Sequence, residues 1–254
     1  MTGKAIDFEK YKEITYESFR ERACNDSLSL HEKVGFPDEY REGREPYIFQ
    51  DILGKLSRLN LRHQTVVDLG PGCSGLARMM VDHCRRFGHQ LIQVDSPEML
   101  ALLPDEPFIL KTPGRFPQDC APLIRAYEGK VDVVLAYSII PCVFAEQNIF
   151  GFIDELLGLL NEGGELLLGD IPNASKRKRF FGSSAGVRFH QTFMGTEEKP
   201  SVEFNVIDHG RMDDAVLLAI LSRCRAAGYD AFLMPQQADL PLSNRREDIL
   251  IIRP

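Results

Sequence analysis

A short apolar run that ends in a glycine-rich turn constrains the fold of this chain more than any other feature. Residues 65–69 read TVVDL and predict a buried strand, and residues 76–87 have the apolar spacing of a helix. The connection between them contains Gly70, Gly72 and Gly75. Glycines at such a position let the backbone turn sharply and approach a ligand closely. Because many α/β proteins have a turn of this kind, its context decides which ligand it serves.

Strands and helices continue to alternate after this turn. Repeated β-α units of this length predict a parallel sheet with helices on both faces. The tail differs, because the helix at 213–227 is followed by two strands, 229–234 and 248–252, with no helix between them. We therefore predict a doubly wound α/β fold with a seven-stranded sheet, mostly parallel, and an antiparallel C-terminal edge strand. The other expected strands are 90–94, 108–111, 131–136 and 165–168, and the expected helices between them include a short one from Pro97, 122–127 and 147–160.

Two regions lie outside this alternating pattern. Residues 1–60 have apolar residues at helical spacing in 6–19 and 47–59, and we treat them as an N-terminal helical extension to a domain at 61–254. Residues 172–212 form a polar insertion between the fifth strand and the next helix. An insertion of this length in an α/β fold is usually a lid or a substrate-binding element. We therefore expect residues 172–212 to close over the site.

The composition argues against several classes of protein. The formal net charge of −7 does not favour nucleic acid, whose phosphates reward clustered Lys and Arg. None of the six cysteines forms a C-x-x-C pair, which argues against a zinc site. No apolar run is long enough to span a membrane, and the N-terminus lacks the apolar segment of a secretory signal. We therefore expect a cytoplasmic protein.

An acidic residue marks the end of the second predicted strand. Asp95 could accept hydrogen bonds from both hydroxyls of a ribose, an arrangement that dinucleotide and adenosyl sites share. Each candidate also has an ordinary structural explanation. Asp95 could cap the helix that begins at Pro97, Gly70 and Gly72 could serve only the turn, and Phe116 could belong to the core.

A set of motifs occurs in a fixed order along the chain. They are VVDLGPGCSG at 66–75, Asp95, VDVVLAYSII at 131–140, LLNEGGELLLGD at 159–170, and DDAVLLAI, YDAFLM and EDILIIRP in the tail. Together they resemble the motifs of class I methyltransferases over about residues 60–254. The resemblance implies S-adenosylmethionine as the cofactor. One departure is the Cys73-Ser74 spacing, which suggests a glycine loop one residue longer than usual.

The resemblance also implies a role for individual residues. Gly70 and Gly72 would lie against the methionine portion of the cofactor, Asp68 would face its amino group, and Asp95 would bind the ribose. Residues 112–116 stand where the family contacts adenine, and Tyr137 and Ser138 would line the cleft beyond the fourth strand. The expected cofactor-binding set is Asp68, Gly70, Gly72, Gly75, Asp95, Ser96, Gly114, Arg115, Phe116, Tyr137 and Ser138.

Methyl transfer from a sulfonium is an in-line displacement, so the protein mainly positions and desolvates the reactants. A hydroxyl acceptor also benefits from a general base, and Asp170 and His190 are the catalytic candidates. Asp170 could instead cap the next turn, as could Asn173, and a lone histidine such as His190 is more often structural. No carboxylate follows the fourth strand, so we expect no metal.

The acceptor is less well determined. The run at 175–179, SKRKR, is either a solvated loop or a clamp for an anionic acceptor. GDIPNASKRKRFF and NRREDILII resemble proteins encoded among surface-polysaccharide genes, which implies a sugar or other small hydroxyl-bearing acceptor, O-methylation and a place in polysaccharide biosynthesis. The identity of the acceptor, O- against N-methylation and a homo-oligomeric state stay open.

Two other functions share parts of this pattern. A nicotinamide-dependent oxidoreductase has the same glycine loop and acidic strand end, but the antiparallel tail and the absence of a Tyr-x-x-x-Lys pattern argue against it. A non-catalytic adenosyl-binding or partner-binding module also fits, because no single catalytic base stands out. Cofactor binding and methyl transfer would separate the three.

Overall fold

The computed structural model describes residues 15–254, which contain one seven-stranded sheet. The strand order is β3-β2-β1-β4-β5-β7-β6; β1 to β5 are parallel, and β7 is antiparallel to both of its neighbours. The predicted sheet is confirmed, with the refinement that β6 forms the edge and β7 lies inside it. The strands are β1 (Thr65–Leu69), β2 (Gln90–Asp95), β3 (Ile109–Pro113), β4 (Val131–Tyr137), β5 (Leu160–Pro172), β6 (Asp230–Pro235) and β7 (Arg246–Ile252).

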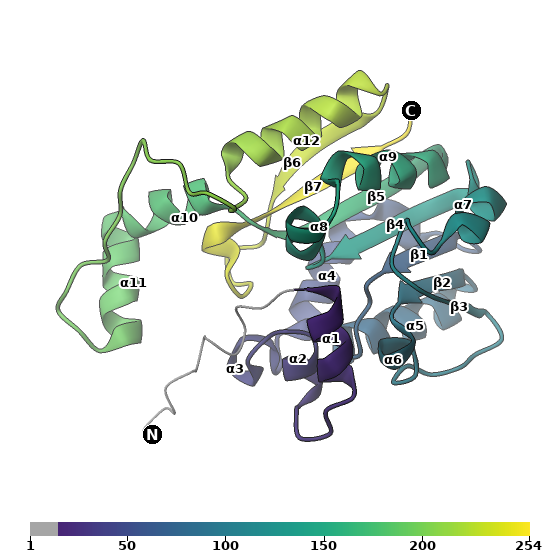
Figure 1. Cartoon of the computed structure of the whole chain (residues 1–254), viewed down its shortest axis with the longest axis horizontal. Helices are drawn as coiled ribbons and strands as arrows, with labels where there is room; N and C mark the ends of the chain where they lie inside the picture. Colours follow the sequence, from purple (N-terminus) through teal and green to yellow (C-terminus); the bar gives the residue numbers. More distant parts are fainter. Residues whose placement is uncertain (1–14) are drawn as a thin grey trace.

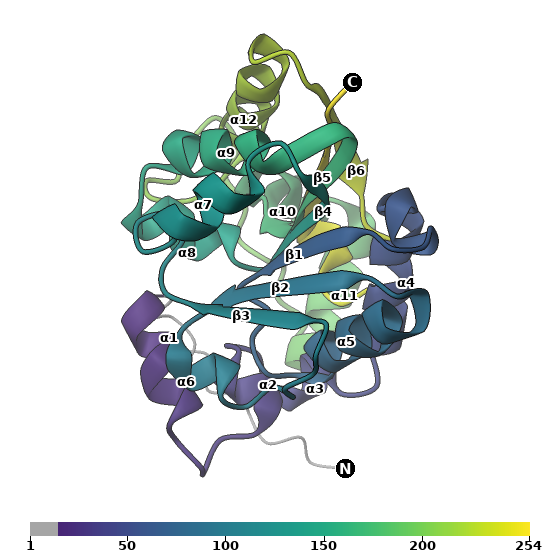
Figure 2. The same cartoon turned by 90° about the vertical axis from the view of Figure 1, so that its right-hand side faces the viewer.

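Helices cover both faces of the sheet, with α4 and α5 on one face and α7, α9 and α12 on the other (Figure 2). This is the doubly wound arrangement that the β-α alternation predicts. The helices are α1 (Tyr16–Ala23), α2 (Leu30–Lys33), α3 (Asp38–Arg41), α4 (Glu45–Lys55), α5 (Gly75–Phe87), α6 (Pro97–Leu100), α7 (Ala121–Tyr127), α8 (Ile140–Glu146), α9 (Ile149–Leu159), α10 (Ala174–Phe181), α11 (Ser184–Met194) and α12 (Asp214–Ala226), with short 3-10 turns η2 (Ser57–Asn60) and η3 (Ser243–Arg245).

Successive residues of β1 belong to two separate hydrophobic cores, one on each face of the sheet. Val66 packs with Ile52 of α4 on one face, whereas Val67 belongs to the cluster that contains Ile153 of α9 on the other. All four side chains are fully buried. Burial on both faces explains why the central strands read as continuous apolar runs rather than alternating ones.

Local structure departs from the sequence prediction in several places. The expected strand at 165–168 is longer, because β5 continues to Pro172 and pairs there with Arg246 of β7. An additional helix, α8, precedes the expected helix at 147–160; the break falls at Asn148, whose side chain caps α9. The short helix α3 lies in the polar stretch at 35–46, where no helix was expected. Most of the expected helix at 6–19 lies outside the described residues, and its last residues belong to α1.

The two regions outside the alternating pattern lie in different places. Figure 1 shows α1, α2 and α3 beside the arrowhead ends of the central strands, while α10 and α11 project away from the sheet beyond the end of β5. No helix within residues 15–254 is both long and apolar enough to cross a membrane.

Candidate active site

A pocket lies at the carboxyl ends of β1 and β4, where the strand order reverses direction. Ligands of doubly wound sheets bind in the crevice at such a switch point. The pocket encloses about 1010 Å³ including its open mouth. Most of the expected cofactor residues line it: Gly70, Gly72, Asp95, Gly114, Arg115, Phe116, Tyr137 and Ser138.

The glycine turn has no room for side chains. Gly70 and Gly72 both have φ of +63°, a left-handed conformation that favours glycine. A Cβ atom on Gly70 would collide with the side chain of Ile139, and one on Gly72 would lie 2.5 Å from a Val34 methyl group. The backbone N–H of Gly72 donates to Asp95 Oδ2 over 3.0 Å, which ties the turn to the end of β2.

Two acidic side chains lie close together beneath this turn. Burial and the neighbouring Asp95 raise the pKa of Asp68 to about 7. Burial also raises the pKa of Asp95 to about 6, although the N–H groups of Ser96 and Gly72 favour its charged form. Carboxylates that lose water in this way gain from a cationic ligand, so the charge of the site suits a positively charged molecule.

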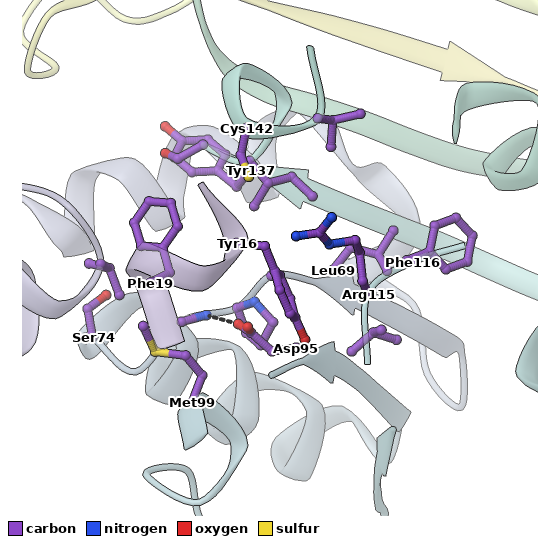
Figure 3. Close-up of a pocket in the computed structure, with 18 of the residues that line it drawn as sticks. Tyr16, Phe19, Leu69, Ser74, Asp95, Met99, Arg115, Phe116, Tyr137 and Cys142 are labelled. Atoms are coloured by element: carbon purple, nitrogen blue, oxygen red, sulfur yellow. Dashed lines mark hydrogen bonds between the residues drawn. The ribbon is translucent and has the colours of Figure 1, made fainter. Parts of the chain in front are cut away.

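The residues after β3 form one wall of the pocket. Phe116 is 5% exposed and meets Phe152 edge to face with ring centroids 5.6 Å apart, so it serves the core and the pocket at once. The guanidinium of Arg115 lies 4.6 Å from the ring centroid of Tyr16 and 3.6 Å from Glu146. Figure 3 shows Tyr16 and Arg115 projecting into the same space above Asp95.

Three expected residues do not line the pocket. Asp68 lies in β1 and is 4% exposed. Gly75 begins α5, and its missing side chain makes room for Glu45, which accepts from the N–H of Leu76 over 3.2 Å. The hydroxyl of Ser96 caps α6 by accepting from the Met99 N–H over 3.2 Å. Direct contact with a ligand is therefore not indicated for these three residues.

The N-terminal helices supply a wall that the sequence analysis did not assign. Arg20 of α1 donates to both carboxylate oxygens of Glu98, over 3.0 and 2.7 Å, and the Tyr16 N–H donates to Glu146 over 2.8 Å. These contacts hold α1 across the pocket. The aromatic residues at 16 and 19, within the amphipathic pattern at 6–19, were the available signal. The N-terminal lining consists of Tyr16, Phe19, Val34, Phe36 and Arg41.

The helix after β4 is the other part of the site that was missed. α8 and the residues around it place Ile139, Cys142 and Val143 against the pocket. No element was expected between the strand at 131–136 and the helix at 147–160, so no predicted element pointed to these residues.

Asp170 reaches the pocket through a neighbouring side chain. It is 3% exposed and does not itself line the pocket. Ser138 Oγ, which does, donates to Asp170 Oδ2 over 2.6 Å, and Arg41 donates to the same oxygen over 3.0 Å. Ser138 and Asp170 have φ of +64° and +58°, respectively. Non-glycine residues in this region are strained and concentrate at functional sites.

A buried network supports this cluster from below. Asp248 is fully buried and accepts from the Asp170 N–H over 2.8 Å and from Lys55 over 2.7 Å. Gln236 donates to Asp248 over 3.0 Å and to Asp170 over 3.4 Å. The cluster is thus fixed by β4, β5, β7, α3 and α4 together.

The insertion does not contribute to this pocket. Among the described residues that line it, none comes from 172–212, and His190 of α11 lies instead beside the ring of Phe181. The basic run is largely paired within the protein: Lys178 with Asp208 over 2.7 Å, Arg179 with Asp214 over 2.5 Å, and Lys176 with the carbonyl of Arg246 over 2.7 Å. We therefore do not retain His190 as the base. Asn173 caps α10.

No set of three or more His, Cys, Asp and Glu side chains within the part of the chain that the structure describes could hold a metal ion.

No protein-family model matches the chain, and no curated protein does. Solved structures do match. The N-methyltransferase NodS from Bradyrhizobium japonicum WM9, in complex with S-adenosyl-L-homocysteine, has a TM-score of 0.56 at 12% identity, over 95% of this chain and 100% of that one. The chain has the class I methyltransferase fold.

Further similar structures extend this finding. The plantazolicin methyltransferase BpumL, in complex with SAH, has a TM-score of 0.54 at 12% identity, over 96% of this chain and 98% of that one. An O-methyltransferase family protein from Burkholderia thailandensis has a TM-score of 0.54 at 18% identity over 96% of this chain. The chain spans 66% of that protein and 47% of the chain that holds the citrinin polyketide synthase CMeT domain.

Proposed function

We propose that this protein is an S-adenosylmethionine-dependent methyltransferase. The observation that carries the proposal is the pocket at the switch point, where the glycine turn, Asp95 and residues 114–116 form one continuous lining. S-adenosylmethionine carries a ribose, an adenine and two positive centres. The family whose fold the chain shares uses the corresponding positions for this cofactor.

The residues fit this cofactor on several counts. Asp95 accepts one N–H at each carboxylate oxygen, from Gly72 and from Ser96, and each oxygen keeps a lone pair for a ribose hydroxyl. Phe116 and Met99 offer apolar surface to an adenine ring. The raised pKa of Asp68 reflects a buried acid that a nearby cation would stabilise in its charged form. When bound, the cofactor supplies an electrophilic methyl group on a sulfonium.

For a hydroxyl acceptor, the Ser138–Asp170 pair is the proposed route for the proton. The acceptor proton passes to Ser138 Oγ as the Ser138 proton passes to Asp170 Oδ2, and the acceptor oxygen takes the methyl group. Arg41 holds the carboxylate in place through its 3.0 Å hydrogen bond. A base used through an intervening hydroxyl lets the carboxylate stay buried, away from water.

The acceptor atom and class are part of the proposal. We favour O-methylation of a small molecule, because the Ser138–Asp170 pair is suited to removing a proton from a hydroxyl. The sugar acceptor of polysaccharide biosynthesis rests on the resemblance of 169–181 and 244–252 alone.

Calorimetry tests the cofactor. S-adenosylhomocysteine should bind with micromolar affinity or better, and NAD⁺ should give no binding heat. Asp95→Ala should weaken binding by roughly 1.5–3 kcal/mol, about 10- to 100-fold, through lost charged hydrogen bonds. Asp82→Ala, which removes an exposed acid on α5, is the matched control. If NAD⁺ binds more tightly than S-adenosylhomocysteine, the protein is better explained as an oxidoreductase. If the cofactor binds but no labelled methyl group is transferred to any cell-extract fraction, a binding module is favoured.

A further inference from the structure

A second cavity, here called the aromatic groove, lies between the N-terminal helices and the projecting insertion. Part of its lining comes from α10 and α11, which stand out from the sheet in Figure 1. None of its lining residues belongs to the cofactor pocket. They are Glu39, Tyr40, Arg44, Phe180, Phe189, Phe193, Gln236 and residues 238–245.

Phenylalanine rings form one wall of the groove. Phe180 and Phe189 meet at 5.6 Å between centroids, and Phe189 stacks on Phe193 at 5.9 Å with an interplanar angle of 6°. Phe189 is 40% exposed and Phe193 is 51% exposed. Aromatic rings gathered and left open in a concave surface mark a binding site more often than single exposed apolar residues do.

The inner end of the groove carries polar atoms without partners. The amide nitrogen of Gln236 faces two carboxylates, those of Asp248 and Asp170, so its oxygen points the other way. Among the described residues, no donor reaches Gln236 Oε1, although the side chain is only 7% exposed, and none reaches Asn244 Oδ1. A buried acceptor without a donor costs about 1–3 kcal/mol, which a ligand hydroxyl or N–H would recover.

A guanidinium without a carboxylate partner lies beside this end. Arg245 is half-buried, its carbon lies 5.7 Å from the ring centroid of Phe181, and burial lowers its pKa. Within residues 15–254 no acid forms an ion pair with Arg245, whereas Arg177, which lies 5.0 Å from the same ring, is exposed and does not line the groove. The acids of the groove, Glu39 and Asp239, are exposed at its rim. The inner charge is therefore positive and available to an anion.

The groove and the cofactor pocket adjoin through the catalytic cluster. Gln236 of the groove donates to Asp170 over 3.4 Å, and Asp170 accepts from Ser138 of the pocket over 2.6 Å. Two hydrogen bonds thus connect the cavities. Tyr40 lines the groove, and the next residue, Arg41, lines the pocket.

We propose that the aromatic groove is a second ligand site, separate from the cofactor pocket, for a small molecule that has a flat apolar body with an anionic group, a carboxylate, sulfonate or phosphate, near a hydrogen-bond donor. The phenylalanines hold the body, Arg245 pairs with the anion, and Gln236 and Asn244 accept from the donor. This ligand chemistry does not depend on the proposed function, because the groove and the cofactor pocket share no lining residue.

Two fluorescent probes test the groove directly, with the cofactor pocket saturated with S-adenosylhomocysteine. 1-Anilinonaphthalene-8-sulfonate is the anionic probe, and N-phenyl-1-naphthylamine is its uncharged counterpart. Phe193→Ser should weaken both probes roughly fivefold or more, since it removes aromatic contact. Phe204→Ser is the control, because Phe204 belongs to the same insertion and is 56% exposed but lies outside the groove.

The charge is tested by Arg245→Gln. This change should weaken the anionic probe roughly tenfold and leave the uncharged probe nearly unaffected, because charged hydrogen bonds are worth about twice neutral ones. Arg86→Gln is the matched control, since Arg86 also lies over a phenylalanine ring, 5.6 Å from that of Phe87, on the distant α5. Melting curves confirm that each variant folds.

Several results would overturn the inference. One is that the wild-type protein binds neither probe; another is that Arg245→Gln affects both probes equally. A change from dimer to monomer in Phe193→Ser by sedimentation, with probe binding unchanged, would make the aromatic wall a subunit interface. If the probes bind but S-adenosylhomocysteine does not, the proposed function is refuted and the groove remains a ligand site. If S-adenosylhomocysteine binds but the variants bind the probes as the wild type does, the groove proposal is refuted and the proposed function stands.

Discussion

The N-terminal helices and the insertion at 172–212 make an instructive pair, because the N-terminal helices line the pocket that the insertion was expected to cover. The sequence assigns the cover of the cofactor site to the insertion and leaves the first 60 residues as an extension. In the structure, Tyr16, Phe19 and Arg41 line the cofactor pocket, while Phe189 and Phe193 of the insertion line the aromatic groove. The length and polarity of residues 172–212 singled out this insertion but did not indicate which cavity it lines.

The largest effect is expected from the Ser138–Asp170 pair, which Arg41 of the N-terminal helices contacts. Asp170→Asn and Ser138→Ala should each lower kcat about 100-fold, because each interrupts the proton route, and should leave the Kd for S-adenosylhomocysteine within about twofold. Steady-state kinetics and calorimetry measure the two quantities. His190→Ala is the comparison variant and should keep kcat. An unchanged kcat in both cluster variants would mean that catalysis is positional.

Aromatic pairs in the two regions should differ in their effect on the cofactor. Tyr16→Ala combined with Phe19→Ala should weaken S-adenosylhomocysteine binding roughly tenfold, because each ring contributes about 0.5–1.5 kcal/mol beyond its buried area. Phe189→Ala combined with Phe193→Ala should leave it nearly unchanged. Calorimetry on the two double variants decides the matter, and equal losses would erase the distinction between the regions.

The regions should also respond to pH with opposite sign. In the pocket, burial raises the pKa values of Asp68 and Asp95 to about 7 and about 6, so their share of the stability is present below about pH 4 and is lost as pH rises through 6 to 7. Lys178 and Arg179 of the insertion lower the pKa values of Asp208 and of Asp214, the first residue of α12, through hydrogen bonds. The stability that these two ion pairs contribute is therefore lost as the solution becomes strongly acidic. Without ligand, Asp68→Asn should raise the melting temperature at pH 8 by about 4 °C and change it little at pH 4. A parallel shift at both pH values would contradict the assignment.

The smallest effect should come from the basic run. Replacing Lys176, Arg177, Lys178 and Arg179 by Ser should lower the melting temperature by about 2–4 °C, since partly exposed ion pairs at the surface contribute little each. The acceptor KM should change only as far as Arg177 contributes, because the other three side chains already bind within the protein. Arg177→Ser alone separates the two effects. If the acceptor KM rises in the fourfold variant but not in Arg177→Ser, the four basic side chains together bind an anionic acceptor.

The sheet could be predicted from the sequence because its signals are local. The buried strands are continuous apolar runs, and the glycine turn, Asp95 and residues 114–116 follow strand ends, so their positions come from topology alone. Asp170 was expected at the end of the fifth strand, but it lies within β5 and contacts the pocket lining through Ser138 and Arg41. What could not be predicted depends on long-range packing. Neither the place of α1 over the pocket nor the pairing of Arg41 with Asp170 across 129 residues leaves a local pattern.

The hydrogen bonds from Arg20 to Glu98 and from the Tyr16 N–H to Glu146 have a consequence for the time course of the reaction. If a bound molecule leaves the pocket only when α1 moves aside, the opening rate of this helix sets an upper limit on turnover. Under such control the first round of transfer is faster than the rounds that follow it. Rapid mixing would then record a burst whose amplitude equals the concentration of enzyme, followed by a slower steady phase.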